Sequence, residues 1–309
     1  MNSGLGWHVG TFSLLGLAVG MCLPDPPFMP LIPAALFLML WPAMLDMELT
    51  GLRDMYQRPR VLLLSLLLNF LVSPALIFVL SRLLLSGTPH GMLIGVLLFG
   101  LMPCGGMAPA YTGMLRGNVG LSVTISAVSL LLSIGIVPLW TEILIGQLVE
   151  VPLGLAARSI AITVLLPLFF AWLIRLTIIW TRGEDAFSEL KPSLKNTSRF
   201  GLMLLAFAIF AMNGRQAVQD PLLMIRIVLA SLLFLTTLLA GSLLLGKVAG
   251  LSPADLTALA ISSATKNNAI SISLALLLFD SQATLAIAIA GPMVQMPVML
   301  GFQRWYRSK

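Results

Sequence analysis

The chain has 309 residues, of which 58% are hydrophobic and only 10% are charged. A soluble domain usually carries about a quarter charged residues, so the composition excludes an ordinary soluble protein and predicts an all-α polytopic membrane protein. The formal net charge of +6 does not indicate a nucleic-acid partner, because the basic residues follow a membrane topology instead. Cys22 and Cys104 both lie in apolar segments, so no disulfide framework is expected.

Apolar runs predict ten membrane-spanning helices. In chain order they cover about residues 9–23, 28–45, 60–86, 89–115, 118–146, 157–180, 199–217, 221–248, 253–279 and 281–303. With the N-terminus in the cytoplasm, the opposite side receives only Arg82, Arg158, Arg215 and Arg226. The cytoplasmic side receives Arg53, Arg58, Arg60, Arg116, Arg182, Lys191, Lys195, Arg199, Lys247, Arg304, Arg307 and Lys309. This positive-inside bias predicts that both termini are cytoplasmic, and we expect a bacterial inner membrane.

The ten spans are expected to form two inverted repeats of five helices, a common plan of secondary transporters in which the substrate binds on broken helices near the bilayer midplane. Residues 1–180 then hold the first repeat and the sixth span, residues 181–198 form a cytoplasmic loop, and residues 199–309 hold spans seven to ten. Asn118 and Ser281 can cap the helices that follow spans four and nine. Aligning the halves on these caps sets "PCGG" (103–106) opposite "KNNA" (266–269).

The fourth span contains two prolines that flank a glycine pair. Pro103 and Pro109 each remove a backbone donor, and Gly105 and Gly106 weaken the helix between them. Backbone groups freed there cannot face lipid, so they must be buried in protein or line a wet cavity. A kinked packing helix is the alternative, but the match to the "KNNA" segment favours a true interruption.

Lys266, in the ninth span, is the only ionisable side chain predicted near the bilayer centre, because all twelve acidic residues fall in loops or at span ends. A central lysine costs about 3 kcal/mol on the insertion scale and usually marks a substrate or ion path. Snorkelling to an interface is the alternative, but Lys266 lies about 20 Å from each end of its span, beyond a lysine's reach. Its charge can be offset by carbonyls of the broken helices, by an anionic substrate, or by loss of its proton.

Polar side chains of three spans accompany this lysine, and together with the two breaks they predict a polar cavity for substrate binding or coupling. The expected residues are Asn69, Cys104, Gly105, Gly106, Ser262, Thr265, Lys266, Asn267, Asn268 and Gln295. Singly, each polar group could join two helices by a hydrogen bond worth under about 1 kcal/mol, and Cys104 could be a small buried hydrophobe. The sequence has no metal-ligand cluster, nucleotide loop or catalytic triad, so no cofactor is expected and a membrane-embedded enzyme is a distant alternative.

The segment "PCGGMAPAYTGMLRGNVGLSVTISAVS" resembles the superfamily that joins bile acid:sodium symporters with arsenite permeases of the yeast-type arsenical-resistance family. The segments "LNFLVSPALIFVLSRLL" and "GPMVQMPVML", with the Pro103, Cys104 and Met107 pattern, are more similar to the arsenite branch. The likeness extends from about residue 30 to the C-terminus. It implies a panel domain of spans 1, 2, 6 and 7, and a core domain of spans 3–5 and 8–10 in which the broken helices 4 and 9 cross.

The resemblance also implies sodium ligands that this chain lacks. A serine and an asparagine of the bile acid branch in span four correspond to Ala108 and Pro109. A glutamate and a glutamine in span nine correspond to Ser262 and Lys266, and a glutamine in span three corresponds to Asn69. Both sodium sites are therefore expected to be lost, with the lysine ammonium standing in for the cation.

These matches favour an alternating-access secondary transporter of a small organic anion that does not use sodium. Uniport, exchange and proton coupling through Lys266 all stay open. The alternative is an arsenite efflux permease with Cys104 as a soft thiolate ligand. The glutamate that accompanies this cysteine in the arsenite branch corresponds to Ala269, and neutral arsenite gains little from a lysine, so we rank this alternative second.

Overall fold

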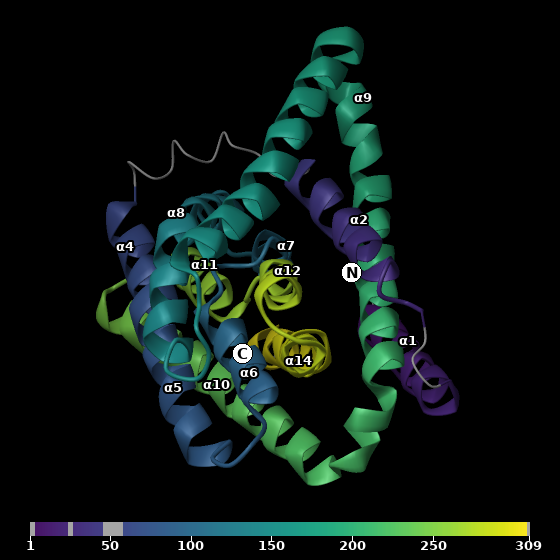
Figure 1. Cartoon of the computed structure of the whole chain (residues 1–309). Coiled ribbons are helices and arrows are strands. Elements are labelled where there is room, and N and C mark those ends of the chain that lie inside the picture. Colours follow the sequence, from purple (N-terminus) through teal and green to yellow (C-terminus); the bar gives the residue numbers. More distant parts are fainter. Residues whose placement is uncertain (1–3, 24–26, 46–57, 308–309) are drawn as a thin grey trace.

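The computed structural model describes residues 4–23, 27–45 and 58–307. These residues are almost entirely helical, which confirms the predicted all-α class (Figure 1). The first helices are α1 (Gly4–Cys22), α2 (Leu31–Leu45), α4 (Pro59–Leu67), the π-helical η2 (Leu68–Val72), α5 (Ser73–Leu84), α6 (His90–Leu101), α7 (Ala108–Met114) and α8 (Val119–Ile145). They are followed by α9 (Leu153–Gln219), α10 (Pro221–Val248), α11 (Pro253–Ala264), α12 (Asn268–Leu278), α13 (Ser281–Ala288), the π-helical η3 (Ile289–Gln295) and α14 (Met296–Arg307). Arg53 and Lys309, which the sequence assigns to the cytoplasmic side, lie outside the described residues.

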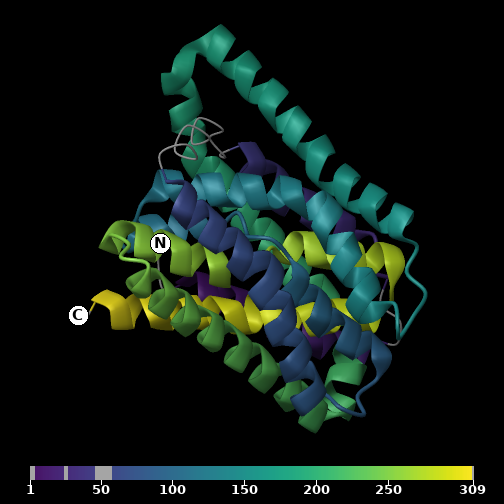
Figure 2. The same cartoon turned by 90° about the vertical axis from the view of Figure 1, so that its left-hand side faces the viewer.

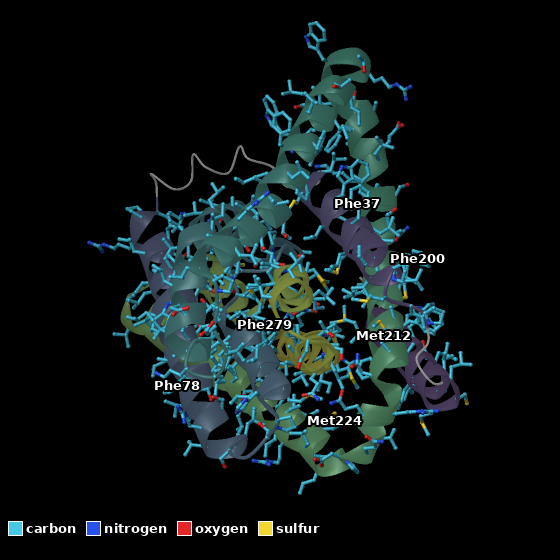
Figure 3. The ribbon with its side chains drawn as sticks, in the orientation of Figure 1. Phe37, Phe78, Phe200, Met212, Met224 and Phe279 are labelled. Atoms are coloured by element: carbon cyan, nitrogen blue, oxygen red, sulfur yellow. The ribbon has the colours of Figure 1, made fainter. Side chains whose placement is uncertain are left out.

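Length and composition make this an integral membrane protein. Among the described residues, five helical stretches are long and apolar enough to cross a bilayer, and they cover Pro59–Leu84, Val119–Ile145, Leu153–Gln219, Pro221–Val248 and Ser281–Tyr306. Large apolar side chains are exposed on the outer faces of the helices, and Phe37 on α2 and Phe200 on α9 are examples (Figure 3). Such a surface is stable against lipid rather than water.

Two of the shorter helical paths are interrupted at the places that the sequence indicates. Residues 102–107 separate α6 from α7, and residues 265–267 separate α11 from α12. The first gap contains Pro103, Gly105 and Gly106, which explains why the helix stops there. In the second gap Asn267 caps the new helix, because its Oδ1 accepts a hydrogen bond from the Ile270 N–H at 3.3 Å.

The 67-residue α9 is a pair of helices that meet at Gly183, whose φ of 85° and ψ of 170° interrupt the helical path. Residues 181–198, predicted as a loop, are instead helical on both sides of this glycine. The segment is polar but rich in good helix formers, so its polarity reflects exposure rather than a loop. The pair projects beyond the other helices in two perpendicular views (Figures 1 and 2). Inside it, the Arg175 guanidinium lies 4.9 Å from the Phe187 ring centre.

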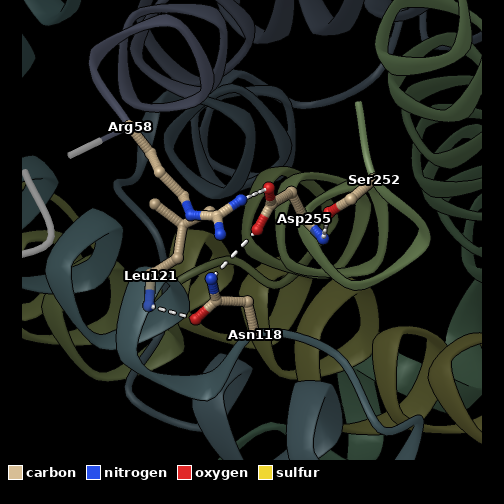
Figure 4. Close-up of polar contacts among 5 residues, drawn as sticks. All are labelled: Arg58, Asn118, Leu121, Ser252 and Asp255. Carbon is tan, nitrogen blue, oxygen red and sulfur yellow. Dashed lines mark hydrogen bonds and ion pairs between the residues drawn. The ribbon is translucent and has the colours of Figure 1, made fainter. Parts of the chain in front are cut away.

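A partly buried polar cluster joins the starts of α4, α8 and α11 (Figure 4). Asp255, in the first turn of α11, forms an ion pair with Arg58 at the start of α4. The other carboxylate oxygen accepts a hydrogen bond from Asn118 Nδ2 at 2.9 Å, while Asn118 Oδ1 caps α8 through the Leu121 N–H. A carboxylate at a helix N-terminus is also favoured by the helix dipole. The cluster therefore fixes three helices whose side chains meet again around Lys266.

Candidate functional site

The two interrupted segments pair with each other through their backbones. Cys104 and Lys266 form an isolated antiparallel bridge. The Gly105 N–H donates to the Thr265 carbonyl at 2.7 Å, and the Asn267 N–H donates to the Pro103 carbonyl at 3.0 Å. Backbone groups released by the two breaks thus satisfy one another inside the protein, as a membrane requires. Gly105 is needed for this approach, because a Cβ there would lie 2.8 Å from the Lys266 carbonyl oxygen.

The Lys266 side chain is almost completely buried, with 1% of its surface exposed. Its Nζ donates a hydrogen bond to Asn69 Oδ1 at 3.0 Å. The amide of Asn69 is oriented by its other end, since Nδ2 donates to the carbonyls of Ser65 at 3.0 Å and Ser262 at 3.4 Å. These acceptors turn the Asn69 carbonyl oxygen toward the ammonium. Among the described residues, no carboxylate forms an ion pair with Lys266.

The backbone of Lys266 is held by Gln295. Gln295 Oε1 accepts from the Lys266 N–H at 2.8 Å, and its Nε2 donates to the Lys266 carbonyl at 3.3 Å. Gln295 ends η3 and Asn69 lies in η2, so both side chains that hydrogen-bond to Lys266 come from π-helical segments. Pro292 within η3, and Pro74 just after η2, remove backbone donors that a regular helix would use. Such π-helical turns are frequent at functional sites.

Hydroxyl groups of α7, α8 and α11 contact one another on the α8 side of the crossing. Ser262 Oγ lies 2.9 Å from Ser122 Oγ, which accepts a hydrogen bond from Thr112 Oγ1 at 3.2 Å. Cys104 Sγ lies 3.2 Å from Ser126 Oγ. Sequence reasoning missed Ser122 and Ser126, although "SVTIS" spaces them four residues apart on one helix face.

A cavity of about 210 Å³ lies between the crossing and the α2–α9 wall, which we define as the lining residues of α2 and α9. Its volume exceeds what a single water molecule occupies by more than tenfold, so it can hold a small solute. Met39, Met44 and Leu202 make the α2–α9 wall largely apolar. Eight of the ten predicted site residues line the cavity: Cys104, Gly105, Gly106, Thr265, Lys266, Asn267, Asn268 and Gln295.

The other two predicted residues, Asn69 and Ser262, do not line the cavity. They lie behind the crossing, where Asn69 binds the Lys266 ammonium. Asn268 Oδ1 is buried without a hydrogen-bond partner and packs against Gly291, where a Cβ would lie 2.3 Å from it. Tyr111, Lys195 and Arg199 also line the cavity, although the sequence analysis did not assign them to it. No group of three or more potential metal ligands occurs in the described ranges.

This apolar helical protein has two broken helices whose backbones cross beside a solute-sized cavity. These features define the class of membrane transporters that bind their substrate at interrupted helices. Comparison with known proteins supports this assignment to the membrane transporters. Residues 33–220 match the Sodium Bile acid symporter family. The chain belongs to this family and is a secondary transporter of its superfamily.

Individual relatives are distant but cover nearly the whole chain. An uncharacterized transporter of Synechocystis sp. is 24% identical over 93% of this chain and 83% of its own length. The arsenical-resistance protein Acr3 of Alkaliphilus metalliredigens is 25% identical over 93% of this chain and 87% of its own. The arsenical-resistance protein Acr3 of Corynebacterium glutamicum is 20% identical over 97% of this chain and 81% of its own length.

Proposed function

We propose that the protein transports a small organic anion by alternating access, without sodium, and that the Lys266 ammonium takes the place of a coupling cation. The observation that carries this proposal is the position of Nζ, which is buried behind the crossing and bound to Asn69 at 3.0 Å. A cation fixed there gives the crossing the positive charge that a bound ion would otherwise supply. Because it is covalently attached, no sodium is needed for that charge.

The surroundings of the lysine support this role for its charge. Lys266 follows the C-terminus of α11 by two residues, where the helix dipole favours a cation. In its protonated form, Lys266 bound to the neutral acceptor Asn69 carries a positive charge that no described carboxylate cancels. An anion in the neighbouring cavity would be attracted by that charge, and the low dielectric of the site strengthens the attraction.

The architecture we propose divides the helices into two groups. Helices α1, α2 and α9 would form the panel domain, and α4 to α8 with α10 to α14 would form the core domain, related by inverted repeats. The cavity lies where α2 and α9 meet the crossing, which is where relative motion of the two groups would open and close it. The hairpin around Gly183 and both termini would be cytoplasmic, in a bacterial inner membrane. Proton coupling through Lys266, exchange and uniport are all compatible with this plan.

A matched ligand screen tests the proposal. Purified protein in detergent is melted in the presence of organic acids, phosphates, bile salts and arsenite, and each acid is paired with its neutral amide. We expect at least one organic acid to stabilise the protein and its amide to have no effect. A ligand at a hundred times its Kd contributes about 2.7 kcal/mol, which a melting curve resolves. Stabilisation by amides as strongly as by acids would contradict an anionic substrate.

Arsenite efflux is the second candidate, and two observations favour it. Two relatives bear the name arsenical-resistance protein, and Cys104 lines the cavity. Its thiol is 1% exposed and lies beside Ser126. Of the described residues that line the cavity, none other than Cys104 has a thiol, so a soft metalloid would have one sulfur ligand of this kind. We therefore keep arsenite in second place.

A further inference from the structure

Two cations on the α2–α9 wall face the cavity from the side opposite the crossing. Lys195 and Arg199 are four residues apart on α9, so their side chains share one helix face, and both line the cavity. Ser198, between them, donates a hydrogen bond from Oγ to the Met39 carbonyl at 2.8 Å. This contact fixes the same region of α9 against α2. The two cations are thus held at the cavity by tertiary packing.

The charged residues among the described lining of the cavity are all cationic: Lys195, Arg199 and Lys266. None of the described residues that line the cavity is an aspartate or a glutamate. Arg199 Nη1 donates to the neutral Asn196 Oδ1 at 3.3 Å, which uses one of the five donors of a guanidinium. Two cations one turn apart on the same helix face can both reach one anion in the cavity.

Lys266 does not directly face an anion held by Lys195 and Arg199. Its ammonium is bonded to Asn69, which is not part of the lining. The charged head of Lys266 therefore belongs to the region behind the crossing, while the charge on the opposite side of the cavity comes from α9.

We propose that Lys195 and Arg199 form the anion-binding subsite of the cavity and determine its charge specificity. This inference rests on the proposed function and deepens it, because it assigns the substrate's oxyanion, a carboxylate or sulfonate, to α9 rather than to Lys266. A planar guanidinium binds such groups through paired hydrogen bonds. The rest of the substrate lies along Met39, Met107 and Met296, whose flexible thioethers adapt to its shape.

Charge-selective labelling of the cavity tests this assignment without knowledge of the substrate. Ala110 lines the cavity and is exposed, so Ala110→Cys in a Cys22→Ser, Cys104→Ser background is the reporter. The second-order rate is measured with the anionic sulfonatoethyl and the cationic trimethylammonioethyl methanethiosulfonates. The small neutral methyl reagent reports accessibility. Met107→Cys is a second reporter if the first variant does not fold.

After correction for their rates with a free thiol, we expect the anionic reagent to react about tenfold faster than the cationic one. The reason is that a cleft lined by one sign of charge raises the encounter rate of oppositely charged molecules by tenfold or more. Lys195→Gln with Arg199→Gln should bring the ratio close to one. Arg182→Gln, an exposed cation of the same α9 hairpin that does not line the cavity, is the matched control and should leave the ratio unchanged.

A ratio that the double variant does not change would overturn the subsite. This outcome is separate from failure of the proposed function. If organic acids stabilise the protein but the ratio ignores Lys195 and Arg199, the transporter proposal stands and the subsite falls. If the ratio behaves as expected but only neutral solutes stabilise the protein, the positive field of Lys195 and Arg199 is real, but both the anionic substrate and the subsite assigned to it fall.

Discussion

Asn69→Ala should destabilise the protein through Lys266. The substitution removes the 3.0 Å hydrogen bond to Nζ and leaves a buried ammonium without its side-chain acceptor. A hydrogen bond to a charged group contributes about 1.5–3 kcal/mol, and leaving the charge unsatisfied adds to this. We therefore expect a loss of about 3 kcal/mol, or a melting temperature lower by roughly 6 °C for a chain of this size.

A compensating variant separates this mechanism from simple loss of packing. Lys266→Met keeps most of the side-chain volume but removes the charge, so we expect its stability to lie within about 1 kcal/mol of the wild type. If the buried charge is the cause, Lys266→Met should restore most of the stability that Asn69→Ala loses. Lys266→Ala is a poorer probe, because its cavity alone would cost about 2–5 kcal/mol.

The assay is a double-variant cycle followed by melting in detergent. Asn213→Ala is the matched control, because Asn213 is also buried and its Nδ2 donates to the Ile209 carbonyl at 2.9 Å. Asn213→Ala should lower the stability by about 1 kcal/mol, and Lys266→Met should not restore this lost stability. A double variant of Asn69 and Lys266 that is as unstable as the sum of the single variants would refute the reasoning.

Two further predictions concern the same crossing. Gln295→Leu should lower stability by about 2 kcal/mol, because the Lys266 N–H and carbonyl lose their partners. The control Gln303→Leu loses only a 3.8 Å contact to Met114 Sδ and should change the melting temperature much less. Equal shifts in the two variants would contradict the role of Gln295. Expression in an arsenite-sensitive host should give little resistance, and Cys104→Ser should not alter it; strong resistance that disappears in Cys104→Ser would place arsenite first.

Local chemistry made the interruptions predictable from the sequence. Pro103, Gly105 and Gly106 remove or weaken helical hydrogen bonds wherever they occur, so the break between α6 and α7 follows from the residues themselves. Lys266 was equally visible, because a lysine far from both ends of an apolar span is costly in any packing arrangement. The break after α11 has no proline, and it was predicted only by matching the two halves.

Features that depend on packing between helices were not predictable. The π-helical segments that direct Asn69 and Gln295 toward Lys266 have no reliable local pattern. The sequence assigns Lys195 and Arg199 only to the cytoplasmic side, because nothing in it indicates which face of α9 meets the cavity. The helical hairpin around Gly183 was mistaken for a loop, since its polar residues are equally typical of an exposed helix.

Sodium dependence of transport tests the central claim most directly. An organic acid that stabilises the purified protein is supplied, radiolabelled, to proteoliposomes, and its initial uptake is measured with sodium or with potassium outside at equal ionic strength. If Lys266 provides the positive charge at the crossing, as proposed, the two rates should be the same, and Lys266→Ala should lose most of the uptake. A tenfold or greater stimulation of the wild-type rate by sodium would contradict the account.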